Sequence, residues 1–282
     1  MGWGLVAPSL LLFGLVYLYP VAYSAWVSGY EWDLTTPARH VGLQNYRELW
    51  SVEFREVITN TVTYSVGVVV LSQALGLVLA ILLNNRTRLG ALFQASIFSS
   101  YVVSWVAVSL LWIWLLDPQY GLVAYLLRLV GLPAVNWLGD HRIALWSLVL
   151  VTVWKTVGYP LVIYLAGLQA IPADLYEAAA LDGAGDWQRF RHITWPLLTP
   201  TSLFLLITLT IASFQGFDIV RIMTQGGPVT ATTIYVYYIY EQAFQYFKLG
   251  KASAAVVVFF TLIVALTLLQ WLLFRRRLHY TT

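Results

Sequence analysis

The side chains that can do chemistry are few in this sequence, and seven of them lie together in one segment between two apolar runs. That segment, DLYEAAALDGAGDWQRFRHITWPLLTP at residues 174–200, holds four acids, two arginines and a histidine. Its first half is rich in alanine, whose small side chain permits close approach of another backbone and anchors poorly in lipid. This composition favours a docking helix for a partner protein. The alternative is a connector at the membrane surface, with Trp187, Phe190 and Trp195 among the headgroups and the arginines on lipid phosphates.

The same segment carries start and stop signals for two short helices. Pro172 cannot extend the preceding helix, and Asp174, with Glu177 three residues on, has the spacing of a capping box. Gly183 suits the left-handed position that ends a helix. The second helix expected to follow, WQRFRHI, is capped by Asp186 and ended by the sequence TWP before the next apolar run.

A second group of polar side chains lies inside apolar runs, where a charge is costly and usually functional. Lys155, in TVWKTVGYP, lies roughly 12 residues from the start of its run and 16 from Ile171, on the order of 18 and 24 Å along a helix. That depth favours a water-filled cavity lined by protein, and Gly158 and Pro160 would loosen the helix there. The alternatives are a side chain that extends to the membrane surface and a structural ion pair.

The run TIASFQGFDIVR also carries polar and aromatic groups. Asp218 and Arg221 have the i, i+3 spacing of an ion pair near one end of a helix. Ser213, Gln215 and Phe217 offer a hydroxyl, an amide and a ring face. Sugars are bound through hydrogen bonds to their hydroxyls and through stacking on rings, so this stretch is suited to contact a carbohydrate.

Several kinds of site are excluded by residues that the sequence lacks. It has no cysteine, which excludes disulfides, thiolate metal sites and cysteine nucleophiles. It has no G-x-x-x-x-G-K-[ST] loop and no H-E-x-x-H, so neither ATP binding by a P-loop nor a zinc protease site is expected. None of the four histidines lies within an apolar run. We therefore predict no enzyme activity, no metal and no cofactor for the isolated chain.

The elements that must position these groups are long apolar helices. Of the 282 residues, 60% are hydrophobic and only 10% are charged, with a mean hydropathy of +0.73. Soluble domains have roughly 25% charged residues, so this composition indicates a membrane protein. The 13 Trp and 18 Tyr suit the headgroup level, where amphipathic rings gather. Because a span needs about 20 apolar residues, we predict six spans, at 4–29, 57–83, 91–116, 143–169, 201–221 and 252–274.

The basic residues near the ends of the spans predict the orientation of the chain. Short loops rich in Lys and Arg favour the cytoplasm, and with six spans two such clusters, at 86–88 and 275–277, lie on one side. Two arginines place the segment at 174–200 there too. Both termini and this segment are therefore expected in the cytoplasm. The outer loops are expected to carry a short helix in 117–142 and an interfacial helix in the Tyr-rich run at 235–247.

The segment at 174–200 resembles the EAA loop of ABC importer permeases. The family pattern is Glu, Ala, Ala, three residues, Gly, nine residues, Ile, one residue and Pro; this sequence departs only before the proline, where Trp195 replaces the usual Leu. VGLQNYRELW, LLDPQYGL, VWKTVGYPLVIYLAGLQAIPADLYEAA and TQGGP are similar to sugar-type permeases, the group of maltose and glycerol-3-phosphate permease subunits. These motifs follow in order over nearly the whole chain. The matching positions of the loop are Glu177, Ala178, Ala179, Gly183, Ile193 and Pro196.

This resemblance implies an all-α polytopic membrane protein with six transmembrane helices, an ABC importer permease (MetI-like) core and a cytoplasmic EAA coupling helix. Residues 1–55 would form the first transmembrane helix and outer loop. Residues 56–274 would form the core of five transmembrane helices, with the EAA loop at 171–200, and residues 275–282 a cytoplasmic tail. The implied location is a prokaryotic inner or plasma membrane.

The resemblance also implies partners and site residues. A second homologous permease, two cytoplasmic ATPases that hold the ATP and magnesium, an extracytoplasmic solute-binding protein and membrane lipid are expected, and nucleic acid is not. The coupling helix would dock in a cleft of an ATPase, and the binding protein would face an outer turn. The residues assigned to ATPase coupling are Glu177, Ala178, Ala179, Asp182, Gly183, Ile193 and Pro196; those assigned to the substrate pathway are Thr152, Trp154, Lys155, Tyr159, Ser213, Phe217 and Asp218; those assigned to the outer turn are Gly226, Gly227 and Pro228.

The implied function is import of a di- or oligosaccharide, coupled to the ATPases through the EAA loop. A permease for glycerol-3-phosphate or another small polar solute is the alternative within the family. A stand-alone secondary transporter would show more buried charge and an internal repeat, and a membrane enzyme or scaffold would show His, Asp or Glu clustered at one depth. Neither pattern is evident in the sequence, and co-purification of an ATPase would separate these classes.

Overall fold

The chain folds mostly into helices, as the sequence predicts. The computed structural model describes residues 2–84 and 87–274, so Arg86 and the predicted tail lie outside the described residues. Within them, two short strands pair antiparallel, with Tyr30 opposite His40. The elements are α1 (Gly2–Phe13), η1 (a π-helix, Gly14–Leu18), α2 (Tyr19–Val27), β1 (Tyr30–Glu31), β2 (Arg39–His40), α3 (Gln44–Leu49), α4 (Val52–Leu82), α5 (Arg88–Val102), α6 (Trp105–Leu115), α7 (Leu122–Leu129), α8 (Ala144–Thr156), α9 (Gly158–Gln169), α10 (Ala173–Leu181), α11 (Asp186–Arg189), η2 (Phe190–Thr194), α12 (Trp195–Leu197), α13 (Thr199–Ser213), α14 (Phe217–Met223), α15 (Tyr235–Tyr240), η3 (Glu241–Gln245) and α16 (Leu249–Phe274).

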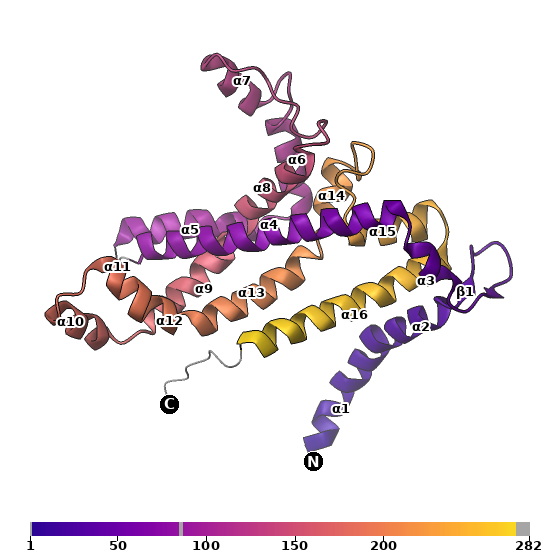
Figure 1. The fold of residues 1–282 in the computed structure, drawn as a ribbon, viewed down its shortest axis with the longest axis horizontal. Coiled ribbons are helices and arrows are strands. Elements are labelled where there is room, and N and C mark those ends of the chain that lie inside the picture. The colour runs from indigo at the N-terminus through magenta and orange to yellow at the C-terminus, as the bar shows by residue number, and fades with distance from the viewer. Residues whose placement is uncertain (1, 85–86, 275–282) are drawn as a thin grey trace.

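Three helical segments are long and apolar enough to cross a membrane by themselves. They confirm the predicted first, second and sixth spans. In the first of them α1, η1 and α2 continue as one curved rod (Figure 1). The three segments are Val6–Val27, Val52–Leu82 and Leu249–Leu272.

Three further helix pairs have the length and composition of spans but are sharply bent. α5 and α6 meet at 101°, α8 and α9 at 46°, and the helix Asp186–Leu197 meets α13 at 61°. If each pair counts as one span, the described chain has six, in agreement with the predicted number. The bend between α8 and α9 lies beside Gly158 and Pro160, where the sequence predicts a loosened helix.

The third predicted span, 91–116, is wrong as a continuous helix because it breaks between α5 and α6. Val103 and Ser104 are extended, and the Ser104 hydroxyl accepts a hydrogen bond from the Ala107 N–H at 3.3 Å. A serine in this position caps the start of a new helix. α6 therefore begins at Trp105 in a new direction.

The fifth predicted span, 201–221, is also wrong as a continuous helix, because α13 and α14 are separated at Gly216. A Cβ atom at Gly216 would lie 2.9 Å from the hydroxyl oxygen of Tyr64 on α4, so the Tyr64 ring occupies the space that a side chain at Gly216 would need. α13 alone is about 22 Å long, shorter than the roughly 30 Å hydrocarbon layer. The helix Asp186–Leu197, which meets α13 at 61°, lengthens this span.

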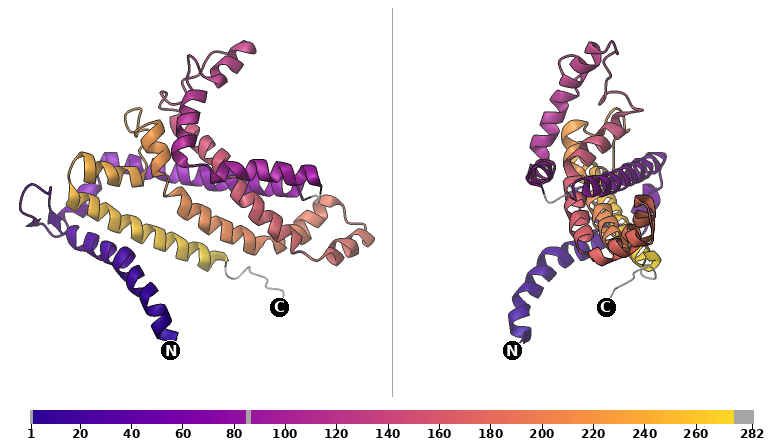
Figure 2. Two further views of the ribbon diagram at one scale, coloured as in Figure 1. Left: turned by 180° about the vertical axis from the view of Figure 1, so that it is seen from behind. Right: turned by 90° about the vertical axis from the view of Figure 1, so that its left-hand side faces the viewer.

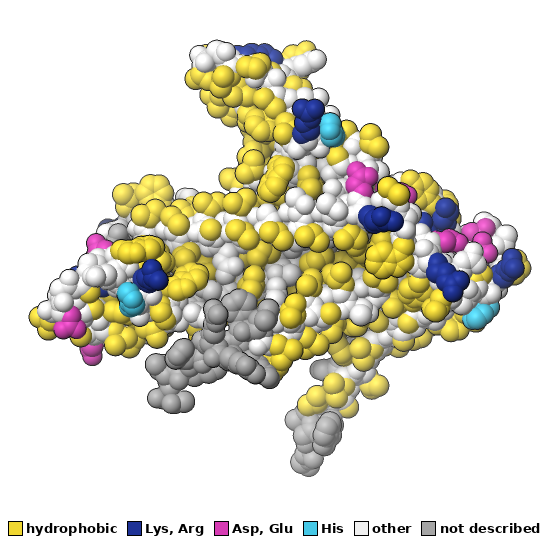
Figure 3. Space-filling model, viewed as in Figure 1, with side chains coloured by type: hydrophobic (Ala, Val, Ile, Leu, Met, Phe, Trp, Pro, Cys, Tyr) yellow, Lys and Arg dark blue, Asp and Glu magenta, His cyan; other side chains and the backbone are white. Residues whose placement is uncertain are grey.

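α4 is the central helix of the body and runs along its long axis (Figure 1). α8, α9 and α13 pack against α4, and α16 packs against α13, α2 and α3. α6 and α7 project from this body (Figure 2). α10 and α11 lie at one end of the long axis, and β1 and α3 lie at the other. Charged side chains gather at these ends and on the projecting arm, while the surface between them is mostly apolar (Figure 3).

The buried core follows α4 in three clusters. Phe54 and Val57 pack with α15 and α16 near the end that carries α3. Tyr64 and Val68 pack with α6, α8 and α14 in the middle. Ala80 packs with α9 and α13 toward the opposite end. One continuous helix therefore connects all three clusters.

The two predicted helices of the outer loops are present, but one is buried. α7 is the short helix expected in 117–142. The Tyr-rich run forms α15 and η3, and Tyr235, Tyr237 and Tyr238 are each at most 1% exposed. The Phe54 ring lies 5.5 Å from that of Tyr235. These three rings face the protein and do not lie among headgroups, whereas Phe244 and Tyr246 later in the predicted interfacial run are 67% and 54% exposed.

Candidate functional site

The helix α10 presents an exposed carboxylate at one end of the molecule. The predicted capping box is absent, because Pro172 occupies the cap position and no side chain caps the helix. Asp174 falls inside the first turn, where a negative charge still favours the helix dipole. Glu177 is exposed, and within the described part of the chain its carboxylate makes no hydrogen bond or ion pair. It is free to meet a partner.

The end of α10 has the geometry that the sequence predicts for Gly183. Its φ is +76°, in the left-handed region that favours glycine. The Gly183 N–H donates to the Ala180 carbonyl at 3.1 Å, and the Ala184 N–H donates to the Ala179 carbonyl at 2.9 Å. These are the two hydrogen bonds of a Schellman motif. Just before this turn, Leu181 is 91% exposed.

The second helix of the segment differs from the prediction at both ends. Gly185, not Asp186, is its cap, and the Gly185 N–H donates to the Gln188 side-chain oxygen at 2.9 Å. Pro196 does not end the helix, which continues through α12. The π-turn η2 precedes the proline, with the Trp195 N–H bonded to the Phe190 carbonyl. The wider π-helical turn leaves room for the Pro196 ring. The helix bends only after Leu197, where it meets α13 at 61°.

Part of the predicted coupling set gathers around one cavity. A hollow of about 390 Å³ between α10 and the second helix is lined by Ala179, Asp182, Gly183 and Ile193. The Tyr176 hydroxyl bonds that of Thr194 at 2.9 Å and ties the two helices together, a contact that no sequence signal indicated. The remaining predicted residues, Glu177, Ala178 and Pro196, are exposed outside this hollow.

The predicted substrate-pathway residues divide into buried and exposed groups. Thr152, Lys155 and Ser213 are each 3% exposed. The Thr152 hydroxyl bonds that of Tyr64 at 2.8 Å, and the Ser213 hydroxyl donates to the Thr210 carbonyl at 2.8 Å. Because three of the seven residues are buried within this chain, the seven cannot all touch one ligand in this conformation.

Lys155 does not face a water-filled cavity, contrary to the prediction. Its ammonium group donates to the Tyr101 carbonyl at 2.9 Å and the Ser100 carbonyl at 3.5 Å. The Trp105 ring lies 4.7 Å away. α5 ends just beyond these carbonyls, so the lysine side chain is held at the break in the third span.

The other four members of the predicted pathway are exposed or partly buried, and they carry three aromatic rings and one carboxylate. Trp154 is 44% exposed and meets the Trp112 ring edge to face at 5.5 Å. Tyr159 stacks on Tyr101 with centroids 5.5 Å apart. Phe217 is partly buried, and Asp218 is exposed.

The Asp218 and Arg221 ion pair considered from spacing is not among the ion pairs of the described residues. Arg221 instead lies over the Tyr240 ring, 5.2 Å from its centroid. Asp218 is therefore left without a basic partner in this part of the chain.

The turn at Gly226, Gly227 and Pro228 is hydrogen-bonded as predicted for a rigid loop. Gly226 has φ +82°, and the Gly227 N–H donates to the Thr224 carbonyl at 2.9 Å. The Thr232 hydroxyl donates to the Gly227 carbonyl at 2.7 Å. The adjacent Val229 is 96% exposed.

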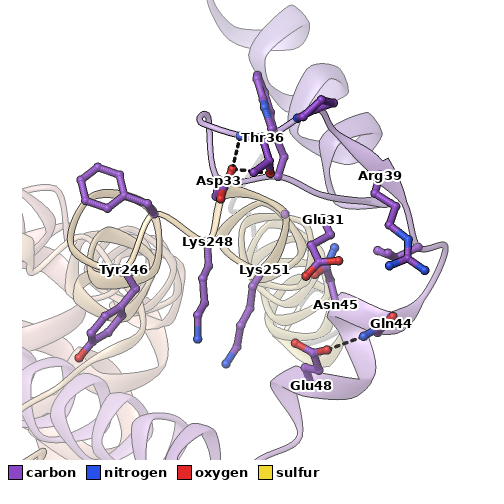
Figure 4. A pocket seen from close by; sticks show the side chains of 15 residues that line it. Glu31, Asp33, Thr36, Arg39, Gln44, Asn45, Glu48, Tyr246, Lys248 and Lys251 are labelled. Carbon is purple, nitrogen blue, oxygen red and sulfur yellow. Dashed lines mark hydrogen bonds between the residues drawn. The ribbon is translucent and has the colours of Figure 1, made fainter.

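A cavity of about 640 Å³ at the end that carries α3 was not predicted from the sequence. Segments 31–48 and 246–251 line it, and Lys248 and Lys251 point into it side by side (Figure 4). Neither lysine is ion-paired within the described residues. Asp33 also lines this cavity. Its carboxylate accepts hydrogen bonds, of which that from the Thr36 backbone N–H has the largest effect, and they lower the pKa of Asp33 to about 2. The cavity thus holds two lysines and the hydrogen-bonded carboxylate of Asp33, and the Lys251 ammonium lies 5.9 Å from the centroid of the Tyr238 ring.

Glu241, at the start of η3, has the most perturbed carboxyl group outside the spans. Burial, together with the charge of Glu53, raises its pKa from 4.5 to about 7, against a smaller opposite effect of Arg221. In the folded protein this group therefore holds a proton that the unfolded chain releases near pH 4.5.

The stability of the protein is expected to fall as pH rises through about 7. A raised carboxyl pKa stabilises the folded state fully below the unfolded value of 4.5, and that contribution is lost above the folded value. The measurement is the unfolding temperature of the purified chain across this range, compared with Glu241→Gln. The variant should show a flatter profile, and two parallel profiles would contradict the assignment.

Comparison with known proteins finds one family and relatives over the whole chain. The family "Binding-protein-dependent transport system inner membrane component" matches residues 72–279. The chain is 33% identical to an sn-glycerol-3-phosphate transport system permease protein of Pectobacterium atrosepticum, over 98% of this chain and 94% of that relative. It is 36% identical to a trehalose/maltose transport system permease protein of Thermococcus litoralis, over 95% and 91%. A bacterial alginate ABC transporter, crystallised with an alginate pentasaccharide-bound periplasmic protein, matches with TM-score 0.85 and 25% identity, over 97% of this chain and 93% of that chain.

Proposed function

Because this chain belongs to the family of binding-protein-dependent transport system inner membrane components, we propose that it is the pore-forming permease subunit of an ATP-driven importer that moves a di- or oligosaccharide into the cell. Membership confirms the family and the permease fold that the sequence motifs predict. The observation that carries the coupling part is α10, an exposed helix with a free carboxylate and a Schellman turn at Gly183.

The coupling mechanism follows from the shape and chemistry of α10. The helix is short, alanine-rich and exposed, so another backbone can approach it closely. Glu177 would pair with a basic or polar group in the ATPase cleft, and Leu181 would supply apolar contact beside the turn. ATP and magnesium would be bound by the ATPase subunits. Closure of the two ATPases would then displace α10 and its counterpart on a second permease.

The assembly and its orientation follow the same proposal. Two permeases, this chain and a homologous one, would form the pore, with two ATPases beneath and a solute-binding protein above. The 171–200 segment and both termini would lie in the cytoplasm. The turn at Gly226, Gly227 and Pro228 and the cavity with Lys248 and Lys251 would then face outward.

The substrate class is proposed from the groups that the chain leaves available. The relatives are named for both a neutral sugar and a phosphate ester. Trp154 and Tyr101 are 44% and 41% exposed, and aromatic rings that are partly exposed suit stacking on a sugar. Lys155 is bonded to carbonyls within the chain, so it does not offer its charge to a phosphate. These features favour a neutral sugar over glycerol-3-phosphate.

The proposal is tested by isolating the tagged chain from gently solubilised membranes and identifying the proteins that accompany it. A second permease and an ATPase are expected, and the ligand of the accompanying binding protein would name the substrate. A chain that purifies alone and moves solute into liposomes without ATP would instead be a secondary transporter.

Reversing two charges in the outer cavity is expected to weaken docking of the binding protein. The double variant Lys248→Glu, Lys251→Glu reverses both cations, and we expect an affinity loss of about tenfold at low salt, decreasing as salt screens the contact. Binding of the purified solute-binding protein to the complex in nanodiscs measures this. Arg142→Glu, an exposed charge outside the cavity, is the matched control. If the solute-binding protein bound the double variant and the Arg142→Glu control with equal affinity, the cavity would not be part of the docking surface.

A further inference from the structure

Lys155 is a buried cation with no anionic partner in the described chain. It is 3% exposed near the middle of the fourth span, and the ion pairs of the described residues do not include it. An isolated charge in such a place is costly unless dipoles compensate it. The groups that surround its ammonium therefore indicate the structural role of Lys155.

The compensating groups are the open carbonyls at the end of α5. The last carbonyls of a helix have no partner within it, and they carry the negative end of its dipole. Here the chain turns extended at Val103 and Ser104, so the Ser100 and Tyr101 carbonyls lack their usual donors. The Lys155 ammonium supplies them, at 3.5 and 2.9 Å.

The contact is reciprocal, because α5 also caps the helix that carries the lysine. The Ser100 hydroxyl lies 3.2 Å from the carbonyls of both Trp154 and Lys155. These carbonyls belong to the last turn of α8, next to its bend into α9. Each of the two helices thus satisfies open carbonyls of the other where both change direction.

The same ammonium contacts the far side of the break in the third span. Trp105 is the first residue of α6, and its ring lies 4.7 Å from the Lys155 nitrogen, within cation–π range. The Tyr101 ring lies at 5.6 Å. One side chain on α8 therefore touches both α5 and α6 on the two sides of their 101° turn.

We propose that Lys155 is a positioning residue, which fixes the angle between α5 and α6 and joins that break to the α8–α9 bend. It affects transport by keeping the helices α5, α6 and α8 in their relative positions, and it does not touch the substrate. This inference rests on the proposed transport function for its functional consequence. Its structural part, a fixed angle at the break, stands on the chain alone.

The structural part is tested by a distance measurement on the full chain in nanodiscs. The chain has no cysteine, so spin labels at Leu92→Cys on α5 and Leu110→Cys on α6, both at exposed positions, report the angle between these two helices without labelling elsewhere. We expect Lys155→Met to broaden the distance distribution and Lys155→Arg to keep it narrow. Ser100→Ala, which leaves the lysine in place, should broaden it to a smaller extent and serves if the methionine variant does not fold. An unchanged distribution in both Lys155→Met and Ser100→Ala would overturn the proposal.

The functional part is tested by uptake into proteoliposomes that contain the whole complex. We expect Lys155→Met to lower the maximal rate by about tenfold or more, with the half-saturating substrate concentration unchanged and most of the rate restored in Lys155→Arg. A raised half-saturating concentration at an unchanged maximal rate would make the lysine a substrate ligand and overturn the proposal. If the wild-type complex does not transport, the proposed function fails, whereas the distance measurement still decides the role of Lys155.

Discussion

Replacing Glu177 with alanine is expected to reduce substrate uptake by the assembled transporter about tenfold or more, while the chain still inserts and folds. The Glu177 carboxylate is exposed on α10 and unpaired within the described chain, so its removal costs the isolated permease little. A charge-assisted hydrogen bond to a partner contributes about 1.5–3 kcal/mol, which corresponds to a tenfold or larger change. The loss should therefore appear only when the ATPase is present. Uptake and substrate-stimulated ATP hydrolysis in proteoliposomes measure it.

Asp174→Ala is the matched control for this experiment. Asp174 is an exposed acid on the same helix, one turn earlier, and it lies in the first turn. Its loss removes a helix-dipole interaction of only about 0.3–1 kcal/mol. If both variants lose transport equally, α10 depends on charge in general and not on the position of Glu177. Full transport by Glu177→Ala would remove the coupling role from this residue.

Gly158→Ala is expected to destabilise the protein by about 1–3 kcal/mol, because it forces two helix backbones apart. A Cβ at Gly158 would lie 2.7 Å from the Phe98 Cα and 2.9 Å from the Ile97 carbonyl oxygen. Both are backbone atoms of α5, so no side-chain rotation relieves the contact. The unfolding temperature of the purified chain should fall by several degrees. Transport should fall as well, because the same contact supports the junction at Lys155.

Gly14→Ala makes the identical chemical change where nothing lies within 4 Å of the added atom. Gly14 is helical, so the substitution should leave the unfolding temperature unchanged or raise it slightly, since alanine is favoured over glycine in helices by about 1 kcal/mol. Similar losses at both positions would mean that the α5–α9 contact is not the cause.

The features that the sequence predicts well are those carried by local signals. Long apolar runs identify α4 and α16, the glycine after the Ala-rich stretch identifies the Schellman turn at Gly183, and a family motif identifies the segment around Glu177. Each depends on residues near one another in the chain. The number of spans could be predicted for the same reason.

The features that the sequence does not predict depend on contacts between distant segments. Ser104 lies within an apolar run, where its capping role shows only once α6 has turned away. The sequence shows the depth of Lys155 in its span, which favours a water-filled cavity, but it does not show that the carbonyls of Ser100 and Tyr101 accept hydrogen bonds from it. The outer cavity requires segments 31–48 and 246–251 to meet, and no local pattern brings them together.

The breaks between α5 and α6, between α8 and α9 and between α13 and α14 have a mechanical consequence. Lys155 joins the break between α5 and α6 to the bend between α8 and α9. At a further break, between α13 and α14, Gly216 lies against the Tyr64 side chain of α4, which itself continues unbroken. α5, α9 and α13 thus act as lever arms, each about 20 Å long, with their pivots at these breaks. A push of about 5 Å on α10 would turn such an arm by roughly 15°. How much of that rotation reaches the outer half of the protein then depends on two features. One is the stiffness of the continuous helix α4, and the other is the strength of the contacts that Lys155 makes with α5 and α6.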